Sequence, residues 1–112
     1  MTIVVVNVCP AGVSNAPPDK LWDAIADIGR WREWTDAVVA GVEPPGRMVQ
    51  RGQVVRLHAP RLRFLRFTID IADIDPQRRW IDLVARFPFG IVNEEHVTLT
   101  ETEQGGTLVR FN

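Results

Sequence analysis

The sequence predicts an α+β domain in which two short helices pack against one antiparallel sheet. Two patterns predict it: apolar side chains follow helical spacing between residues 18 and 34, and from residue 38 onward they follow the two-residue period of strands. Clusters of proline, glycine and aspartate separate the later strands by connections short enough for antiparallel hairpins. The chain has 112 residues, the length of a single domain.

The first predicted element is a strand over residues 2–9, which are rich in β-branched side chains. It ends at the segment 9–12, because Pro10 removes a donor from the ladder and Gly12 permits a bend, and the strand can resume for a few residues afterwards. Cys9 has no base beside it in this apolar stretch. We interpret it as a small buried hydrophobic residue.

Two short helices are predicted next. Pro17 and Pro18 pre-set the backbone of a first helical turn, and Asp19 lies near the positive end of the helix dipole. The apolar side chains at helical spacing are Leu21, Trp22, Ile25 and Ile28, of which Trp22 and Ile25 are expected in the core. Gly29 is expected to break this helix, and residues 30–34 to form a further short turn of helix.

Five to six strands are expected after the helices, and residue parity divides them into two faces, since alternate side chains point to opposite sides of a sheet. We place them at residues 38–43, 52–58, 62–74, 78–87, 91–103 and 107–112. In the long strands the odd-numbered face is the more apolar one and is predicted to face inward. It includes Phe67, Ile69, Leu83, Phe87 and Val97, while Trp80 is expected on the outer face.

Asn93 and Glu95 form the best polar pair on the predicted inner face. A carboxylate there is costly to bury unless it has a partner, a raised pKa or a water-filled cavity. Glu95 is therefore a candidate general acid or base acting on a carbonyl or hydroxyl group. The alternative is that Glu95 pairs with an arginine or lies at a cavity mouth.

The two histidines do not predict a metal site. Parity places His96 on the outer, solvated face, and neither His58 nor His96 has a second ligand at metal-binding spacing. The sequence also lacks a glycine-rich phosphate loop and a nucleophile elbow. No metal and no cofactor are expected.

Charge excludes a general nucleic-acid binder, because the formal net charge is -1. One region is nevertheless basic: between Glu43 and Asp70 there are six arginines and no acidic residue, namely Arg47, Arg51, Arg56, Arg61, Arg63 and Arg66. They either cover the outer face and rim, paired with Asp70, Asp73 and Asp82, or form an anion-selective entrance. In the second case Arg63, at inward parity, would hold a ligand carboxylate or phosphate through its bidentate fork.

Four segments together resemble the START-like superfamily, also called SRPBCC or Bet v 1-like, and especially its polyketide cyclase/dehydrase and lipid transport branch. They are Ala16–Asp27 (APPDKLWDAIAD), Trp31–Trp34 (WREW), Asp73–Arg79 (DIDPQRR) and Gly105–Val109 (GGTLV). The resemblance implies a helix-grip fold: a curved antiparallel sheet of about seven strands around a long C-terminal helix, with two short helices between the first two strands. It also implies a hydrophobic ligand cavity bordered by the short helices, so that Trp31 or Trp34 would contact the ligand.

This sequence departs from the family pattern because no long helix follows the strand that ends near Phe111. We expect either that the chain is shortened or that a partner covers the open face of the sheet. A second copy, forming a homodimer, is one such partner. A bare apolar face would otherwise be unusual.

The leading functional hypothesis is binding of a small hydrophobic ligand, such as a lipid or polyketide, in a cavity between sheet and helices. The predicted ligand-binding residues are Trp31, Trp34, Arg63, Phe67, Ile69, Leu83, Phe87, Asn93, Glu95 and Val97. Two alternatives remain: a polyketide aromatase/cyclase or dehydratase in which Glu95 moves protons and Arg63 or Arg56 steadies an oxyanion, and a regulatory interaction domain. With no membrane span, no secretory signal and a single cysteine, we expect a cytoplasmic protein without nucleic-acid partners.

Overall fold

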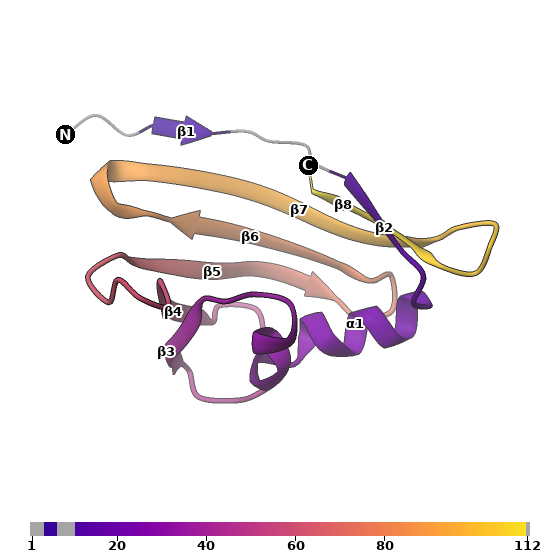
Figure 1. Cartoon of the computed structure of the whole chain (residues 1–112), viewed down its shortest axis with the longest axis horizontal. Coiled ribbons are helices and arrows are strands. Elements are labelled where there is room, and N and C mark those ends of the chain that lie inside the picture. Colours follow the sequence, from indigo (N-terminus) through magenta and orange to yellow (C-terminus); the bar gives the residue numbers. More distant parts are fainter. Residues whose placement is uncertain (1–3, 7–10, 112) are drawn as a thin grey trace.

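A computed structural model describes residues 4–6 and 11–111, and Cys9 lies outside these residues. Over the described residues the chain forms eight strands, one α-helix and two short 3₁₀ helices (Figure 1). In chain order they are β1 (Val4–Val6), β2 (Ala11–Ser14), α1 (Pro18–Ala26), η1 (Ile28–Glu33), β3 (Val38–Glu43), β4 (Val54–His58), β5 (Arg66–Asp75), β6 (Trp80–Arg86), η2 (Pro88–Gly90), β7 (Ile91–Glu101) and β8 (Thr107–Phe111). The predicted α+β class and the two short helices ahead of the strand meander are confirmed.

One curved sheet contains all these strands, in the order β2-β8-β7-β6-β5-β4-β3. Every neighbouring pair along this path is antiparallel. β1 lies off the path and pairs in parallel with the first residues of β7. This is the sheet of the helix-grip fold, and no long helix follows β8 within the described residues.

The helical segment breaks at Asp27, so the predicted break at Gly29 is wrong. The Asp27 backbone is extended, and its carboxylate accepts a hydrogen bond from the Gly29 backbone N–H at 2.9 Å, which caps η1. The residues on either side bond to the loop after β3: Val49 N–H donates to Ala26 C=O at 2.8 Å, and Ile28 N–H donates to Arg47 C=O. Ile28 therefore begins η1 instead of ending α1. A tertiary contact with a distant loop decided this boundary.

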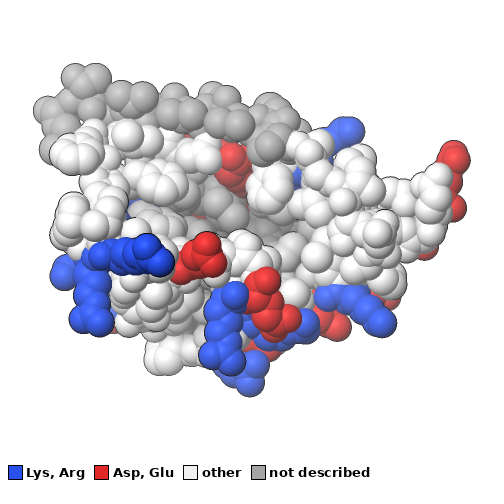
Figure 2. Space-filling model, viewed as in Figure 1, with Lys and Arg blue, Asp and Glu red and all other residues white. Residues whose placement is uncertain are grey.

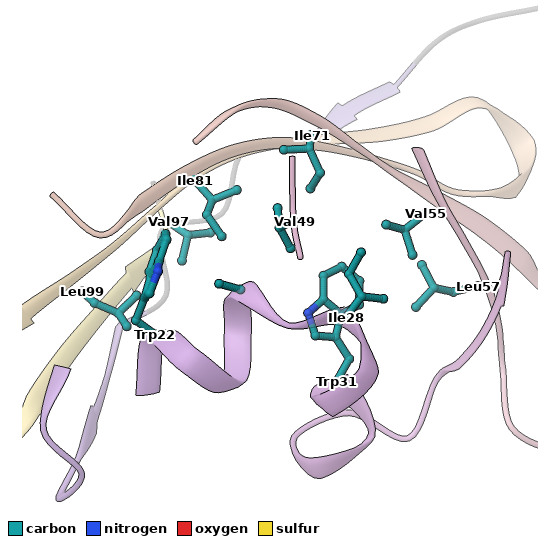
Figure 3. Close-up of a cluster of buried hydrophobic side chains, with 11 residues drawn as sticks. Trp22, Ile28, Trp31, Val49, Val55, Leu57, Ile71, Ile81, Val97 and Leu99 are labelled. Carbon is teal, nitrogen blue, oxygen red and sulfur yellow. The ribbon is translucent and has the colours of Figure 1, made fainter. Parts of the chain in front are cut away.

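The core lies between α1, η1 and one part of the inner face of the sheet (Figure 3). Trp22 from α1 points toward Val97 and Leu99 of β7, and Trp31 from η1 lies near Val49. The buried cluster comprises Trp22, Ala26, Ile28, Trp31, Val49, Val55, Leu57, Ile71, Ile81, Val97 and Leu99. Ile25 packs against it partly buried, so the predicted inward parity and the core placement of Trp22 hold for this part of the sheet.

The structure corrects the predicted beginning of β5. The strand starts at Arg66 instead of residue 62, because the chain before it makes turns that include a Leu65 N–H hydrogen bond to Leu62 C=O at 2.9 Å. Arg63 is therefore an exposed turn residue, and its predicted inward parity is wrong. Further along, a bulge between Ile71 and Asp73 reverses the parity, so that Ile74 pairs with Ile81 beside the core.

Candidate functional site

The inner face of the sheet extends beyond the helices that cover its core. Figure 1 shows α1 beside one end of the long strands β5, β6 and β7, whose other end continues past it. Six side chains on this further part are only partly buried or exposed: Phe67, Ile69, Leu83, Phe87, Asn93 and Glu95. We call these six residues the inner-face site.

The strand register brings the inner-face site together. Ile69 pairs with Ala85, which pairs with Asn93 across β6 and β7. One row closer to the core, Leu83 pairs directly with Glu95. Neighbouring side chains on one face of an antiparallel sheet lie about 5 Å apart, so the apolar residues and the polar pair form one continuous surface.

Two phenylalanines border this surface where β6 turns into β7. The rings of Phe67 and Phe87 stack with centroids 5.3 Å apart and an interplanar angle of 23°. Phe87 also closes the turn, because its backbone N–H donates to Ile91 C=O at 2.8 Å. The stack provides a flat apolar wall that suits an aromatic or aliphatic ligand.

Asn93 and Glu95 lie two residues apart on β7 and bond to each other. Asn93 Nδ2 donates to Glu95 Oε1 at 2.8 Å. The other oxygens of the pair, Asn93 Oδ1 and Glu95 Oε2, are buried and have no hydrogen-bond partner among residues 4–6 and 11–111. Both are acceptors, so the site offers two hydrogen-bonding positions that a donor on a ligand would fill.

The other predicted site residues lie elsewhere. Trp31 and Val97 are 4% exposed and belong to the core, where Trp31 Nε1 donates to Ile25 C=O at 2.7 Å. Trp34 is 51% exposed, with its ring centroid 5.5 Å from that of Trp31. Arg63 lies in the β4–β5 turn and lines a pocket to which Phe67 also contributes. Of the two tryptophans, only Trp34 presents a large surface to a ligand.

A pocket of about 640 Å³ lies between η1 and β3, and the sequence reasoning missed it. Ile28, Val38, Val39 and Val42 line its apolar part, and Arg32, Asp36 and Arg47 contribute charged groups. In the sequence the valines of β3 follow the pattern of an ordinary strand, so nothing there marks them as residues that line a pocket. Only the packing of η1 beside this edge strand creates the pocket.

The basic segment divides into paired and unpaired arginines. Arg47 pairs with Asp27 at 2.8 Å, Arg51 with Asp73 at 3.0 Å and Arg56 with Glu43 at 3.4 Å. Within the described part of the chain no carboxylate lies within ion-pair distance of the other three, which are Arg61, Arg63 and Arg66. Pairing with nearby carboxylates thus accounts for three of the six arginines of the basic segment.

On the outer face, His96 Nδ1 bonds to the Asp82 carboxylate, and its ring lies 5.4 Å from that of Trp80. Both placements agree with the predicted parity. Among residues 4–6 and 11–111, no three histidine, cysteine, aspartate or glutamate side chains are grouped closely enough to hold a metal ion. None of the helices described is long and apolar enough to cross a membrane.

The model of one protein family, described as polyketide cyclase / dehydrase and lipid transport, matches residues 10–112. The chain belongs to this family. The match includes all four segments of the predicted resemblance and every strand from β2 to β8, which confirms the START-like assignment. No curated protein is significantly similar to this polyketide cyclase/dehydrase family member in sequence.

Solved structures share the fold of this family member at low sequence identity. DynU16, from the dynemicin biosynthetic locus, superposes with a TM-score of 0.66 at 19% identity, covering 94% of this chain and 36% of DynU16. CalU16 from Micromonospora echinospora gives 0.65 at 19% identity, covering 92% of this chain and 55% of CalU16. Ara h 8.0201 gives 0.64 at 16% identity, covering 94% and 76%. The chain thus spans about a third of DynU16 and about half of CalU16.

Proposed function

We propose that this family member binds a small hydrophobic ligand against the inner-face site, and that the ligand carries a hydroxyl group or another hydrogen-bond donor. The observation that supports it is the pair of buried acceptors, Asn93 Oδ1 and Glu95 Oε2, without partners among the described residues. A buried polar atom without a partner costs about 1–3 kcal/mol, a cost that a bound donor would remove. The neighbouring apolar side chains of Ile69 and Leu83 favour a hydrophobic ligand body.

A catalytic role is the second candidate, and the same carboxylate supports it. Glu95 Oε2 has no described partner, so it is available to take a proton from a bound hydroxyl group or return one to it. The family description names polyketide cyclases and dehydrases, and a dehydration removes a hydroxyl group with the help of an acid or a base. In this role the Phe67–Phe87 stack would orient the substrate, and Glu95 would act as general acid or base.

The test of ligand binding compares a donor with its matched non-donor. We expect 2-naphthol to bind more tightly than 2-methoxynaphthalene, because the methyl ether has a similar shape but no O–H to donate. The difference should be at least about tenfold in Kd, the lower end of the value of one hydrogen bond to a charged acceptor. Isothermal titration calorimetry on the 112-residue chain measures both constants.

Glu95→Gln is the matched variant, and Glu94→Gln is its control, because Glu94 is exposed on the opposite face of the same strand. Glu95→Gln should reduce the preference for 2-naphthol, whereas Glu94→Gln should leave it unchanged. Equal affinity of the wild-type protein for the two compounds would contradict the proposed hydrogen bond. For the catalytic candidate, turnover of a poly-β-ketone substrate that survives Glu95→Gln would eliminate the acid–base role.

A further inference from the structure

Two neighbouring turns at one end of the sheet carry an unusual amount of exposed apolar surface. The β4–β5 turn presents Phe64, which is 74% exposed, and Leu62, which is 45% exposed. The β6–β7 turn presents Phe89, which is 86% exposed, and the first residue of β7, Ile91, is 37% exposed beside it. We call these four residues the hairpin tips.

The hairpin tips lie side by side. β5 and β6 are paired strands, with Thr68 opposite Arg86 at the end of the ladder, and the Phe67–Phe87 stack joins the bases of the two turns. Figure 1 places both turns at the left end of the molecule. Their apolar side chains therefore form one surface at an end of the longest axis, which measures 46 Å.

The backbone at Phe89 adopts a conformation that disfavours the side chain this residue carries. Phe89 has φ 67° and ψ 23°, the left-handed conformation that favours glycine and asparagine and disfavours a bulky aromatic residue. Its ring gains little from burial, since 86% of the residue is exposed. The conformation costs stability and the exposed ring returns almost none, and a residue of this kind is an indicator of a functional contact.

Unpaired positive charge surrounds the hairpin tips. Arg61 and Arg63 flank Leu62 in the β4–β5 turn, and Arg66 begins β5. These are the three arginines of the basic segment without a carboxylate partner in the part of the chain described, and no acidic residue occurs between Glu43 and Asp70. On the face shown in Figure 2, the left end carries blue side chains and no red ones.

We propose that the hairpin tips dock on an anionic lipid bilayer. The apolar side chains would enter the interfacial region of the membrane, while Arg61, Arg63 and Arg66 would lie at the level of the anionic headgroups. A bilayer fits better than a nucleic acid because Leu62 and Ile91 are aliphatic and lie at the ends of hairpins, whereas single-stranded nucleic acid is bound along a groove with aromatic stacking platforms. Docking of this kind requires no membrane-spanning helix.

This proposal does not depend on the hydroxyl-bearing ligand, because it uses none of the polar atoms of Asn93 or Glu95. It would place the Phe67–Phe87 border of the inner-face site next to the bilayer. Failure of 2-naphthol binding would leave it intact. Failure of vesicle binding would likewise leave the ligand proposal intact.

Cosedimentation of the 112-residue protein with sucrose-loaded vesicles tests the proposal. We expect binding to vesicles of phosphatidylcholine with phosphatidylserine, weaker binding to phosphatidylcholine alone, and a loss of binding as salt rises. Each arginine near an anionic membrane surface contributes roughly a fivefold increase in affinity. The double variant Arg61→Glu/Arg63→Glu should therefore bind the anionic vesicles at least about 25-fold more weakly than the wild type. Arg78→Glu, on an exposed turn at the other end of the sheet, is the charge control and should bind like the wild type.

Phe89→Asn separates membrane docking from a structural role. Asparagine accepts the left-handed backbone and removes the ring, so this variant should be at least as stable as the wild type in urea while binding vesicles about tenfold more weakly. Val13→Ser is the apolar control, because Val13 is 74% exposed on β2. Absence of binding to the anionic vesicles would overturn the proposal, as would unchanged binding of Phe89→Asn. Dimerisation in sedimentation velocity that the hairpin-tip substitutions abolish would also overturn it, by making this end a contact between copies.

Discussion

Trp31 within η1 and Trp34 directly after it should differ strongly in how much stability they lose on substitution by phenylalanine. In Trp31→Phe, a residue that is 4% exposed loses its indole N–H, which donates to Ile25 C=O at 2.7 Å. Shrinking the ring in a packed core costs about 1–2 kcal/mol, and leaving the carbonyl of the last turn of α1 without its donor costs about 1–3 kcal/mol. We therefore expect a loss of about 2–5 kcal/mol in the free energy of unfolding.

Trp34→Phe is the matched control. Trp34 is 51% exposed, and its Nε1 donates to Ala24 C=O at 3.2 Å, so water can replace the lost donor and little packing disappears. The expected loss is below about 1 kcal/mol. Urea unfolding followed by far-ultraviolet circular dichroism measures both variants without relying on the fluorophore that changes. Losses that agree within about 0.5 kcal/mol would refute the assignment of Trp31 to the core and Trp34 to the surface.

Two further substitutions test local features of the fold. Gly106→Ala should reduce the free energy of unfolding by about 2 kcal/mol or more, because a Cβ there would overlap the Ser14 carbonyl oxygen. Gly12→Ala is its control: a Cβ at Gly12 meets open space, so the free energy of unfolding should change by less than about 0.5 kcal/mol. Thermal unfolding compares the two variants, and equal melting temperatures would contradict the close approach of Gly106 to Ser14. Asp73→Asn should cost stability in a pH-dependent way, because the Ile74 backbone N–H and the Arg51 guanidinium lower the pKa of Asp73 below 3.8 in the folded protein. A carboxyl whose pKa is lowered on folding stabilises the folded state above its unfolded pKa, and this contribution disappears as pH falls through the folded value. The stability difference between wild type and Asp73→Asn should therefore be constant at neutral pH and shrink below about pH 4; a difference that grows toward acid would contradict this sign.

Periodicity predicted the strands well because the alternation of side chains between the two faces of a strand is a local property of the backbone. Alternation placed Ile71, Ile81 and Val97 on one inner face, and all three are buried against the helices. The same alternation placed Asn93 and Glu95 beside each other on that face, and the structure joins them by a hydrogen bond. Their role in binding remains a prediction.

The predicted element boundaries were wrong where backbone contacts between residues distant in sequence override the local preference of the chain. The break between α1 and η1 falls at Asp27 because Asp27 forms an isolated antiparallel bridge with Met48. The spacing of apolar residues in the helical segment does not predict this contact. The chain ahead of β5 turns before Arg66, which moved Arg63 from the predicted inner face to an exposed turn. A strand boundary depends on where the partner strand ends, and here β4 ends at His58, opposite Arg66.

The sequence by itself determined the class of the fold, the order of its elements, the division of the sheet into an apolar and a polar face, and the family resemblance. These properties follow from periods, turn residues and motifs that act within a few residues of each other. Only the tertiary structure decided that Trp31 is core, that Trp34 is exposed, and that the apolar tips of two separate hairpins lie side by side next to unpaired arginines. The physical reason is that burial and charge pairing depend on strand register and helix placement, which join residues far apart in the chain.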